Sequence, residues 1–408
     1  MSAEEDSHYL KSVTSLGDTR EVVTNQDIYS RTGIKLASRG SRINSSFYDR
    51  LVRHKLMPNL DECMTVEGAV STRELLSRAK ALFENDSPLS GMAEFVEMER
   101  LWAIVSKINL NNALSFKLTV AREKRPEILE HSLRIMLLSL YIGLRRDLPE
   151  SEMVALATAA AFHDLGELHI DPEILDKQHA LTPDERRHIY AHPMTAHVIL
   201  KGFPIYHPLI STAVLEHHEY LDGSGYPAGL PGEKIGHLSQ ILGIAEVTGG
   251  IRNRERLEIV LKLNKHKLNT HLIGLVSELF RPGAGASGAD RNSGDIGKTL
   301  ALLAESFDEW DKLCHARGAD TPIVKFANQR IQNLRHALFD AGFNPYEPGW
   351  LISGIEDDPE GLLDVEALIS ESAWQLKSLV RELDRFWPDK DGEAVKTWIG
   401  NCIQKMVN

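Results

Sequence analysis

Four stretches between residues 161 and 247 decide the fold and the chemistry of this chain: AFHDLGELHIDPEIL (161–175), AHPMTAHVIL (191–200), LEHHEYLDGSGYPAGLPGEKIG (215–236) and LGIAEV (242–247). They contain a His-Asp pair, a helical His, a His-His pair and a Gly-Tyr-Pro turn. With one upstream histidine and the glutamate of the last stretch, they offer nitrogen and oxygen ligands of the kinds that bind hard or borderline metals. The seven candidate ligands are His131, His163, Asp164, His192, His217, His218 and Glu246.

Each of these signals is weak by itself. The chain has 17 histidines, and a single histidine on a helix is more often a surface or hydrogen-bonded residue than a ligand. His188 and His192 have the spacing of a zinc pair, but the glutamate of an HExxH motif is missing. Of these two histidines, only His192 is therefore expected to bind metal. The specific signal is the combination of HD, H, HHE and DGSGYP in this order and spacing.

A pair of divalent cations explains why a site would need these residue types. Two ions about 3.5–4 Å apart can ionise a bridging water and neutralise the oxygens of a phosphodiester. A carboxylate has two oxygens, so Asp164 is the expected bridge between them. Adjacent residues of a helix point about 100° apart, so the pairs at 163–164 and 217–218 need a helix end or two neighbouring ions. The sequence therefore predicts a phosphohydrolase in which a metal-bound hydroxide attacks phosphorus.

Composition excludes several other classes of protein. The 408 residues carry a net charge of −12 with no basic stripe, which argues against binding of a nucleic-acid polymer. Cys63, Cys314 and Cys402 fit no CxxC spacing, which favours a reducing cytoplasm. The N-terminus is polar and acidic, unlike a signal peptide, and the longest apolar runs are about half the length of a membrane span. We therefore expect a cytoplasmic protein with no membrane partner.

The periodicity of apolar residues predicts a mainly α protein with an all-helical core. Residues 1–19 are expected to be a loose polar tail, and short strands with a hairpin turn are expected after them. The role of this N-terminal module is open between packing against the core and sensing. The connector after it would either join the module to the core or lie along it as a dimer stalk. The expected parts are a small β-rich module (1–65), a helical connector (66–124), the core (125–282), a Gly/Ala/Ser-rich flexible linker (283–296) and a helical C-terminal domain of unknown role (297–408).

The motif segments resemble the HD-GYP subgroup of the HD phosphohydrolases, over roughly residues 125–280. The residues that carry the resemblance are HDLGE (163–167), DPEIL (171–175), LTPDE (181–185), AHP (191–193), HHEYLDGSGYPAGLPGEKI (217–235) and AEV (245–247). The resemblance implies a bacterial phosphodiesterase that hydrolyses cyclic di-GMP. It also implies two divalent ions, or three in some members, with iron or manganese as the expected metals. Signalling proteins and a second copy of the chain are the further partners that it suggests.

By this resemblance, the seven ligands named above hold the metals, and Glu127 is the candidate ligand of a third ion. The loop Gly225, Tyr226 and Pro227 is expected to act in substrate access or partner contact, although a plain tight turn explains the same residues. Lys177 and Arg252 are the candidate cations for contact with substrate.

Two positions depart from the family pattern. Glu167, a catalytic candidate beside Asp164, stands where the family has a lysine that is thought to meet the substrate phosphate, and Glu246 stands where an aspartate is usual. An anion in place of a cation removes an attraction and adds a repulsion, each worth roughly a few kcal/mol at about 4 Å and an effective dielectric of about 20. Three functions therefore stay open: a cyclic di-GMP phosphodiesterase, a catalytically weak or inactive signalling module that binds metal or nucleotide, and a phosphohydrolase for another phosphoester.

Overall fold

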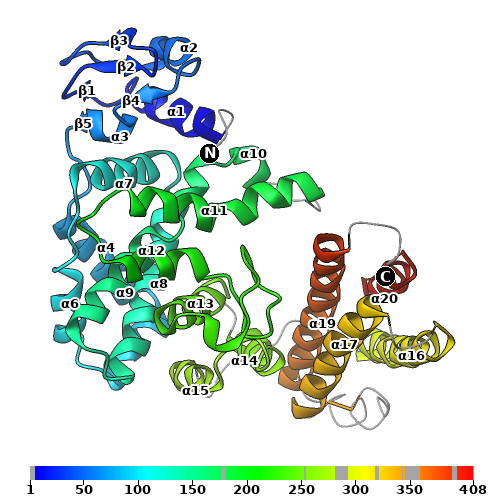
Figure 1. Ribbon diagram of the computed structural model, residues 1–408. Helices are drawn as coiled ribbons and strands as arrows, with labels where there is room; N and C mark the ends of the chain where they lie inside the picture. The colour runs from blue at the N-terminus through cyan, green and yellow to red at the C-terminus, as the bar shows by residue number, and fades with distance from the viewer. Residues whose placement is uncertain are drawn as a thin grey trace. The chain divides into compact units, whose positions relative to one another are not determined.

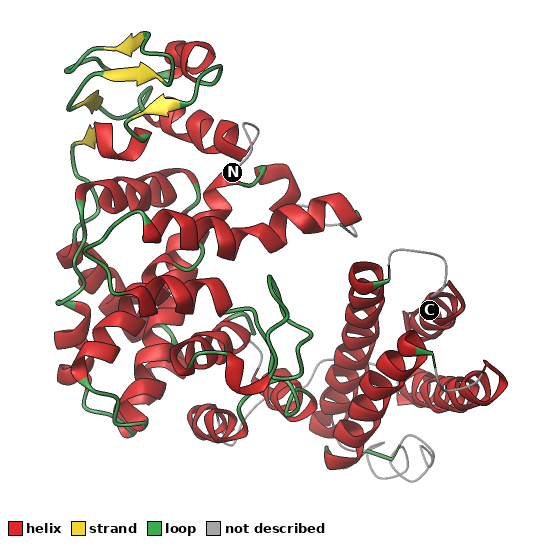
Figure 2. Cartoon of the chain, viewed as in Figure 1, coloured by secondary structure: helices red, strands yellow, loops and turns green. Residues whose placement is uncertain are grey.

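The computed structural model describes residues 5–175, 181–251, 254–280, 293–317, 321–341, 343–344, 359–387 and 393–407. The fold is mainly helical, as the periodicity predicts, and the strands of the described residues all lie between residues 22 and 66 (Figures 1 and 2). The chain divides into two compact units, Met1–Gly250 and Ile251–Asn408. In the described part of the chain, no helix combines the length and the apolar character that crossing a membrane requires.

The first unit begins with a helix, where a loose tail was expected. Helix α1 (Glu5–Leu16) buries Tyr9, Leu10, Val13 and Leu16, which recur at helical spacing and form one apolar face. The expectation of a loose polar tail is therefore wrong for residues 5–16. The acidic start of the sequence concealed the apolar face that follows it.

Five short strands follow α1 and form two small antiparallel sheets. The sheets have the orders β1-β5 and β3-β2-β4, with Gly33 at a φ of 86° in the turn between β2 and β3. Helical segments interrupt the strands, and all of them belong to the same compact unit as the helical core. A separate β-rich module therefore stays a prediction. The elements are β1 (Val22–Thr24), β2 (Ile28–Ser30), β3 (Lys35–Ala37), η1 (Ser45–Phe47), α2 (Tyr48–Leu51), β4 (Leu56–Met57), α3 (Leu60–Cys63) and β5 (Met64–Val66).

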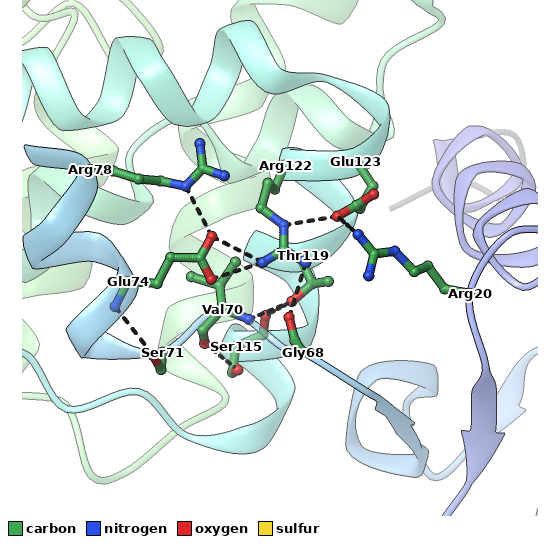
Figure 3. Close-up of polar contacts among 10 residues, drawn as sticks. All are labelled: Arg20, Gly68, Val70, Ser71, Glu74, Arg78, Ser115, Thr119, Arg122 and Glu123. Carbon is green, nitrogen blue, oxygen red and sulfur yellow. Dashed lines mark hydrogen bonds and ion pairs between the residues drawn. The ribbon is translucent and has the colours of Figure 1, made fainter. Parts of the chain in front are cut away.

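The segment after β5 is helical and is tied to α7 by a polar network (Figure 3). The Arg122 guanidinium donates to both carboxylate oxygens of Glu74, at 3.0 and 2.8 Å, and to the carbonyl of Gly68 at 3.0 Å. The N–H of Val70 donates to Thr119 Oγ1 at 2.8 Å. These bonds fix the chain that leaves the sheets against α7. The elements are α4 (Thr72–Asn85), α5 (Ser87–Ser90), η2 (Gly91–Glu94), α6 (Met98–Val105) and α7 (Asn112–Lys124).

The core of the first unit consists of helices that begin and end where the sequence marks them. Proline occupies the first turn of α8, α11 and α12, and Thr182 forms the expected capping box with Glu185 at the start of α11. Helices α8 and α9 are buried along most of their length. The elements are α8 (Pro126–Arg145), α9 (Glu150–Phe162), η3 (Leu165–His169), α10 (Pro172–Leu175), α11 (Pro183–Lys201), α12 (Pro208–Glu216), η4 (Gly232–Lys234) and α13 (His237–Gly249).

The second unit begins earlier than the expected core boundary at residue 282. Ile259 and Leu263 of α14 belong to the same apolar cluster as Trp310 and Trp398, and Asn264 donates to Glu371 of α19 at 2.8 Å. Residues 283–292 of the expected linker (283–296) lie outside the described residues, and residues 293–296 form the first turn of α16. The elements are α14 (Arg254–Leu263), α15 (Thr270–Leu279), α16 (Ser293–Arg317), α17 (Pro322–Asp340), α19 (Pro359–Phe386) and α20 (Glu393–Val407).

Candidate metal centre

The first unit gathers the seven candidate ligands into two neighbouring clusters. Within each cluster the potential ligand atoms all lie within 4.8 Å of one another. The side chains come from α8, the end of α9, α11, the end of α12 and α13. The first cluster is His131, His163, Asp164 and Glu246, and the second is His192, His217 and His218.

Asp164 lies between the two clusters and presents one carboxylate oxygen to each. Its Oδ2 lies 3.1 Å from Nε2 of His163 and 3.6 Å from Nε2 of His131. Its Oδ1 lies 3.4 Å from Nε2 of His192 and 3.8 Å from Nε2 of His217. This is the arrangement that a carboxylate needs in order to bridge two cations.

Helix ends allow the adjacent pairs to face one site. Helix α9 ends at Phe162, so His163 and Asp164 lie in the turn that leads into η3. Helix α12 ends at Glu216, and His217 and His218 follow it directly. Both pairs therefore escape the divergence of about 100° between neighbours that a continuous helix would impose.

Three of the histidines are fixed in the tautomer that binds metal through Nε2. His163 Nδ1 donates to the carbonyl of Ala160 at 2.8 Å. In the same way, His192 donates to Ile189 at 2.7 Å and His217 to Val214 at 2.6 Å. Because Nδ1 carries the proton in the neutral ring, the lone pair of Nε2 faces the cluster. Burial acts to lower the pKa of His163, but Asp164 and Glu246 raise it well above its ordinary value, so His163 loses its second proton when it binds a metal.

The donor set fits divalent cations. Nε2 of His192 and Nε2 of His217 lie only 3.3 Å apart, and two lone pairs at that distance repel unless a cation lies beside them. Burial, followed by the effect of neighbouring imidazoles, lowers the pKa of His218 to about 3 and brings the pKa of His217 well below its ordinary value. These rings are therefore neutral at neutral pH, which is the state that binds metal.

The acidic residues of the centre differ in protonation. Burial acts to raise the pKa of Glu246, but His131 and His163 lower it well below its ordinary value; Nε2 of His131 lies 2.8 Å from Glu246 Oε2. Burial, together with the charges of Asp164 and Glu246, raises the pKa of Glu167 to about 8. In the absence of metal Glu167 is therefore mainly neutral at neutral pH, whereas the family pattern alone led us to expect an anion at this position.

The other candidate residues lie in different surroundings. Glu127 is exposed, pairs with Arg125 and belongs to neither cluster. Lys177 and Arg252 lie outside the described residues. The Tyr226 ring stacks on His218 with centroids 4.6 Å apart, and Gly225 and Pro227 flank it in the same loop.

Sequence reasoning missed two residues that hold this loop in place. Tyr190 of α11 stacks on Tyr226 at 4.2 Å. The buried Glu219 carboxylate accepts the N–H groups of Ala228, Gly229 and Leu230 at 2.6, 3.0 and 2.8 Å. Glu219 stands just before the glycine-rich loop, and an acidic residue at that position is a signal that the loop's backbone N–H groups could bind it. Nothing in the sequence pairs Tyr190 with Tyr226, because α11 lies far from the loop along the chain.

The seven candidate ligands all lie within the residues that match a known family model. The family model of the HD domain matches residues 116–248. The chain is 26% identical over 240 residues to 3′3′-cGAMP-specific phosphodiesterase 3 of Vibrio cholerae. These residues cover 57% of this chain and 52% of that protein. It is 37% identical over 101 residues to the cyclic di-GMP phosphodiesterase response regulator RpfG of Xanthomonas campestris, with 24% and 27% covered.

A third relative is the cyclic di-GMP phosphodiesterase PA4108 of Pseudomonas aeruginosa, 27% identical over 184 residues, which cover 43% of this chain and 44% of that protein. The chain thus spans about half, or less, of the length of the curated relatives that it matches.

Proposed function

Since the chain is an HD domain protein of the HD-GYP type, we propose that it is a metal-dependent phosphodiesterase that hydrolyses a cyclic dinucleotide, with cyclic di-GMP as the expected substrate. The observation that carries this proposal is Asp164, which offers one oxygen to each of two ligand clusters. The names of the relatives support the substrate class, because they are phosphodiesterases for cyclic di-GMP or 3′3′-cGAMP.

The residues of the two clusters would hold two divalent ions, with iron or manganese as the metals expected from the family. When bound, such ions neutralise charge on phosphoryl oxygens and lower the pKa of a coordinated water. The backbone carbonyls of Ala160, Ile189 and Val214 hold the imidazoles in the ligating tautomer. The Tyr226 ring is stacked between Tyr190 and His218, which holds the Gly-Tyr-Pro loop beside the second cluster.

The direct test is turnover by protein purified without oxygen and analysed for metal. We expect at least two equivalents of divalent metal per chain and conversion of cyclic di-GMP to the linear dinucleotide, with 3′3′-cGAMP assayed in parallel. Chelation should remove both the metal and the turnover, and added Mn²⁺ should restore them. Protein that holds two equivalents of metal and cleaves neither dinucleotide would contradict the proposal.

Glu167 favours a second candidate, a catalytically weak module that binds metal or nucleotide and acts through protein partners. A carboxyl group at this place offers no positive charge to a phosphate, whether it is neutral or ionised. We expect Glu167→Lys to lower KM for cyclic di-GMP about tenfold, because the substitution places a cation beside the site. The same change of charge at the exposed Glu173 is the control, and it should leave KM unchanged.

The wild-type protein and the Glu167→Lys variant together separate the two candidates. Measurable turnover by the wild type that Glu167→Lys improves mainly through KM supports the enzyme. Turnover that appears only in Glu167→Lys supports the weak module. If Glu167→Lys alters neither affinity nor turnover, the idea that Glu167 weakens catalysis fails.

A further inference from the structure

A cavity of about 360 Å³ lies in the first unit, between the N-terminal segments and the helical core. Its walls come from α1, the segment from residue 51 to residue 62, α7, η3 and α11. Of the described residues that line it, none belongs to either metal cluster. Protein interiors contain few voids larger than a water molecule, and small-molecule pockets begin at about 300 Å³. The size is therefore that of a binding site.

One end of the cavity is a buried polar network. Lys117 of α7 is only 3% exposed, and its Nζ lies 2.8 Å from Asp61 Oδ2. The same Nζ lies 3.6 Å from the centroid of the Tyr9 ring and 3.4 Å from Nε2 of His169. The Tyr9 hydroxyl donates to the other oxygen of Asp61, and the Tyr9 ring stacks on His169 at 4.8 Å.

Beyond this network an apolar patch forms part of the wall, next to polar residues such as Ser7 and Asn59. Leu10, Leu51 and Leu60 are buried side chains that line it, and Ile199 and Phe203 contribute from the end of α11 and just beyond it. A cavity that joins a buried polar network to an apolar patch fits a small molecule that has one polar part and one apolar part.

The charges of the lining select against a charged ligand. Two lysines, Lys55 and Lys117, balance two acids, Asp61 and Glu62, among the lining residues. Lys117 and Asp61 already neutralise each other, so an ionic head group at that end would compete with one member of a buried pair. Leaving the other member unpaired in a buried place is strongly unfavourable.

We propose that this cavity binds an uncharged amphipathic small molecule, with a hydroxyl or amide head at the Tyr9–Asp61–Lys117 network and a ring or short chain against the leucines. The site is also placed to regulate the metal centre. Its polar end includes His169, the last residue of η3, and η3 follows Asp164 directly. Only this regulatory consequence rests on the proposed function; the binding itself does not.

Three isosteric probes test the charge preference: benzyl alcohol, benzoate and benzylamine. Binding to the full chain is followed by ligand-observed NMR and by the shift of the unfolding temperature, which rises when a ligand binds the folded state. We expect benzyl alcohol to bind with a Kd in the range of about 1–10 mM, as its size allows. Benzoate and benzylamine should bind at least about tenfold more weakly, because the charge of benzoate is repelled by Asp61 and the charge of benzylamine by Lys117.

Variants locate the binding. Val52→Phe fills the cavity and should weaken benzyl alcohol at least about tenfold, whereas Ile34→Phe, at a side chain 57% exposed and outside the lining, should not. Asp61→Asn removes the negative member of the pair and should reverse the preference, so that benzoate binds more tightly than benzyl alcohol. Circular dichroism checks that each variant is folded, and Asp61→Asn decides the matter if Val52→Phe is not.

The proposal is overturned if none of the probes binds, if benzyl alcohol binds wild type and Val52→Phe equally, or if a charged probe binds wild type as tightly as benzyl alcohol. The regulatory consequence is supported if saturation with benzyl alcohol changes cyclic dinucleotide turnover in wild type but not in Val52→Phe. Unchanged turnover in wild type overturns that consequence alone. Since binding is measured without turnover, failure of this site and failure of the proposed enzyme are distinguishable.

Discussion

Asp164→Asn is expected to lose most of its bound metal and at least about 10³-fold of its turnover. The carboxylate lies within 3.8 Å of four imidazole nitrogens that belong to two clusters. Asparagine has one oxygen in place of two and no negative charge, so it cannot offer an equivalent oxygen to both clusters. Elemental analysis after desalting and a cyclic di-GMP assay on the same sample measure the two losses.

The matched control is Asp184→Asn on the exposed first turn of α11. Asp184 pairs with Arg187 at 2.8 Å, and both side chains are largely exposed, so the pair contributes little to stability. This variant should keep the metal content and turnover of the wild type. If Asp164→Asn also keeps both metal ions and its rate, Asp164 is not the bridge and the two-ion arrangement is wrong.

The ligand types could be predicted from sequence because local rules place them. The HD and HH pairs were expected at helix ends, and α9 and α12 end directly before them. The capping box at Thr182 was readable for the same reason, since it involves residues three apart. What could not be read is that Asp164 faces both clusters, because this depends on how α8, α11, α12 and α13 pack around one turn.

The errors also have physical causes. The four apolar residues that α1 buries lie among polar and acidic residues, so the sequence of this short segment reads as polar. Its apolar face matters only because other elements of the first unit pack against it. α14 was assigned to the core because it follows α13 in sequence. It belongs instead with α19, because Ile259 and Leu263 find their apolar partners there. Protonation was missed as well: the burial that raises the pKa of Glu167 to about 8 is a tertiary property.

Gly166→Ala is expected to lower metal affinity by about tenfold or more, although Gly166 is not itself a ligand. A Cβ at this position would lie 2.1 Å from the carbonyl oxygen of His192 and 2.8 Å from its carbonyl carbon. Both are backbone atoms, so η3 must move away from α11 to admit the methyl group. His192 Nε2 lies 3.4 Å from Asp164 Oδ1 across this contact, and the movement separates the two clusters at the bridge.

Competition with a chelator for Mn²⁺ and unfolding in urea measure this effect. Overpacking of this kind costs about 1–3 kcal/mol in the free energy of unfolding. Gly274→Ala is the matched control, because its added Cβ in α15 meets no atom within 4 Å outside the neighbouring backbone of its own helix, and alanine favours a helix. Weaker metal binding in Gly166→Ala alone would show that the close approach of η3 to α11 holds His192 against Asp164. Wild-type affinity in Gly166→Ala would mean that the cations, and not the packing, set the distance between the clusters.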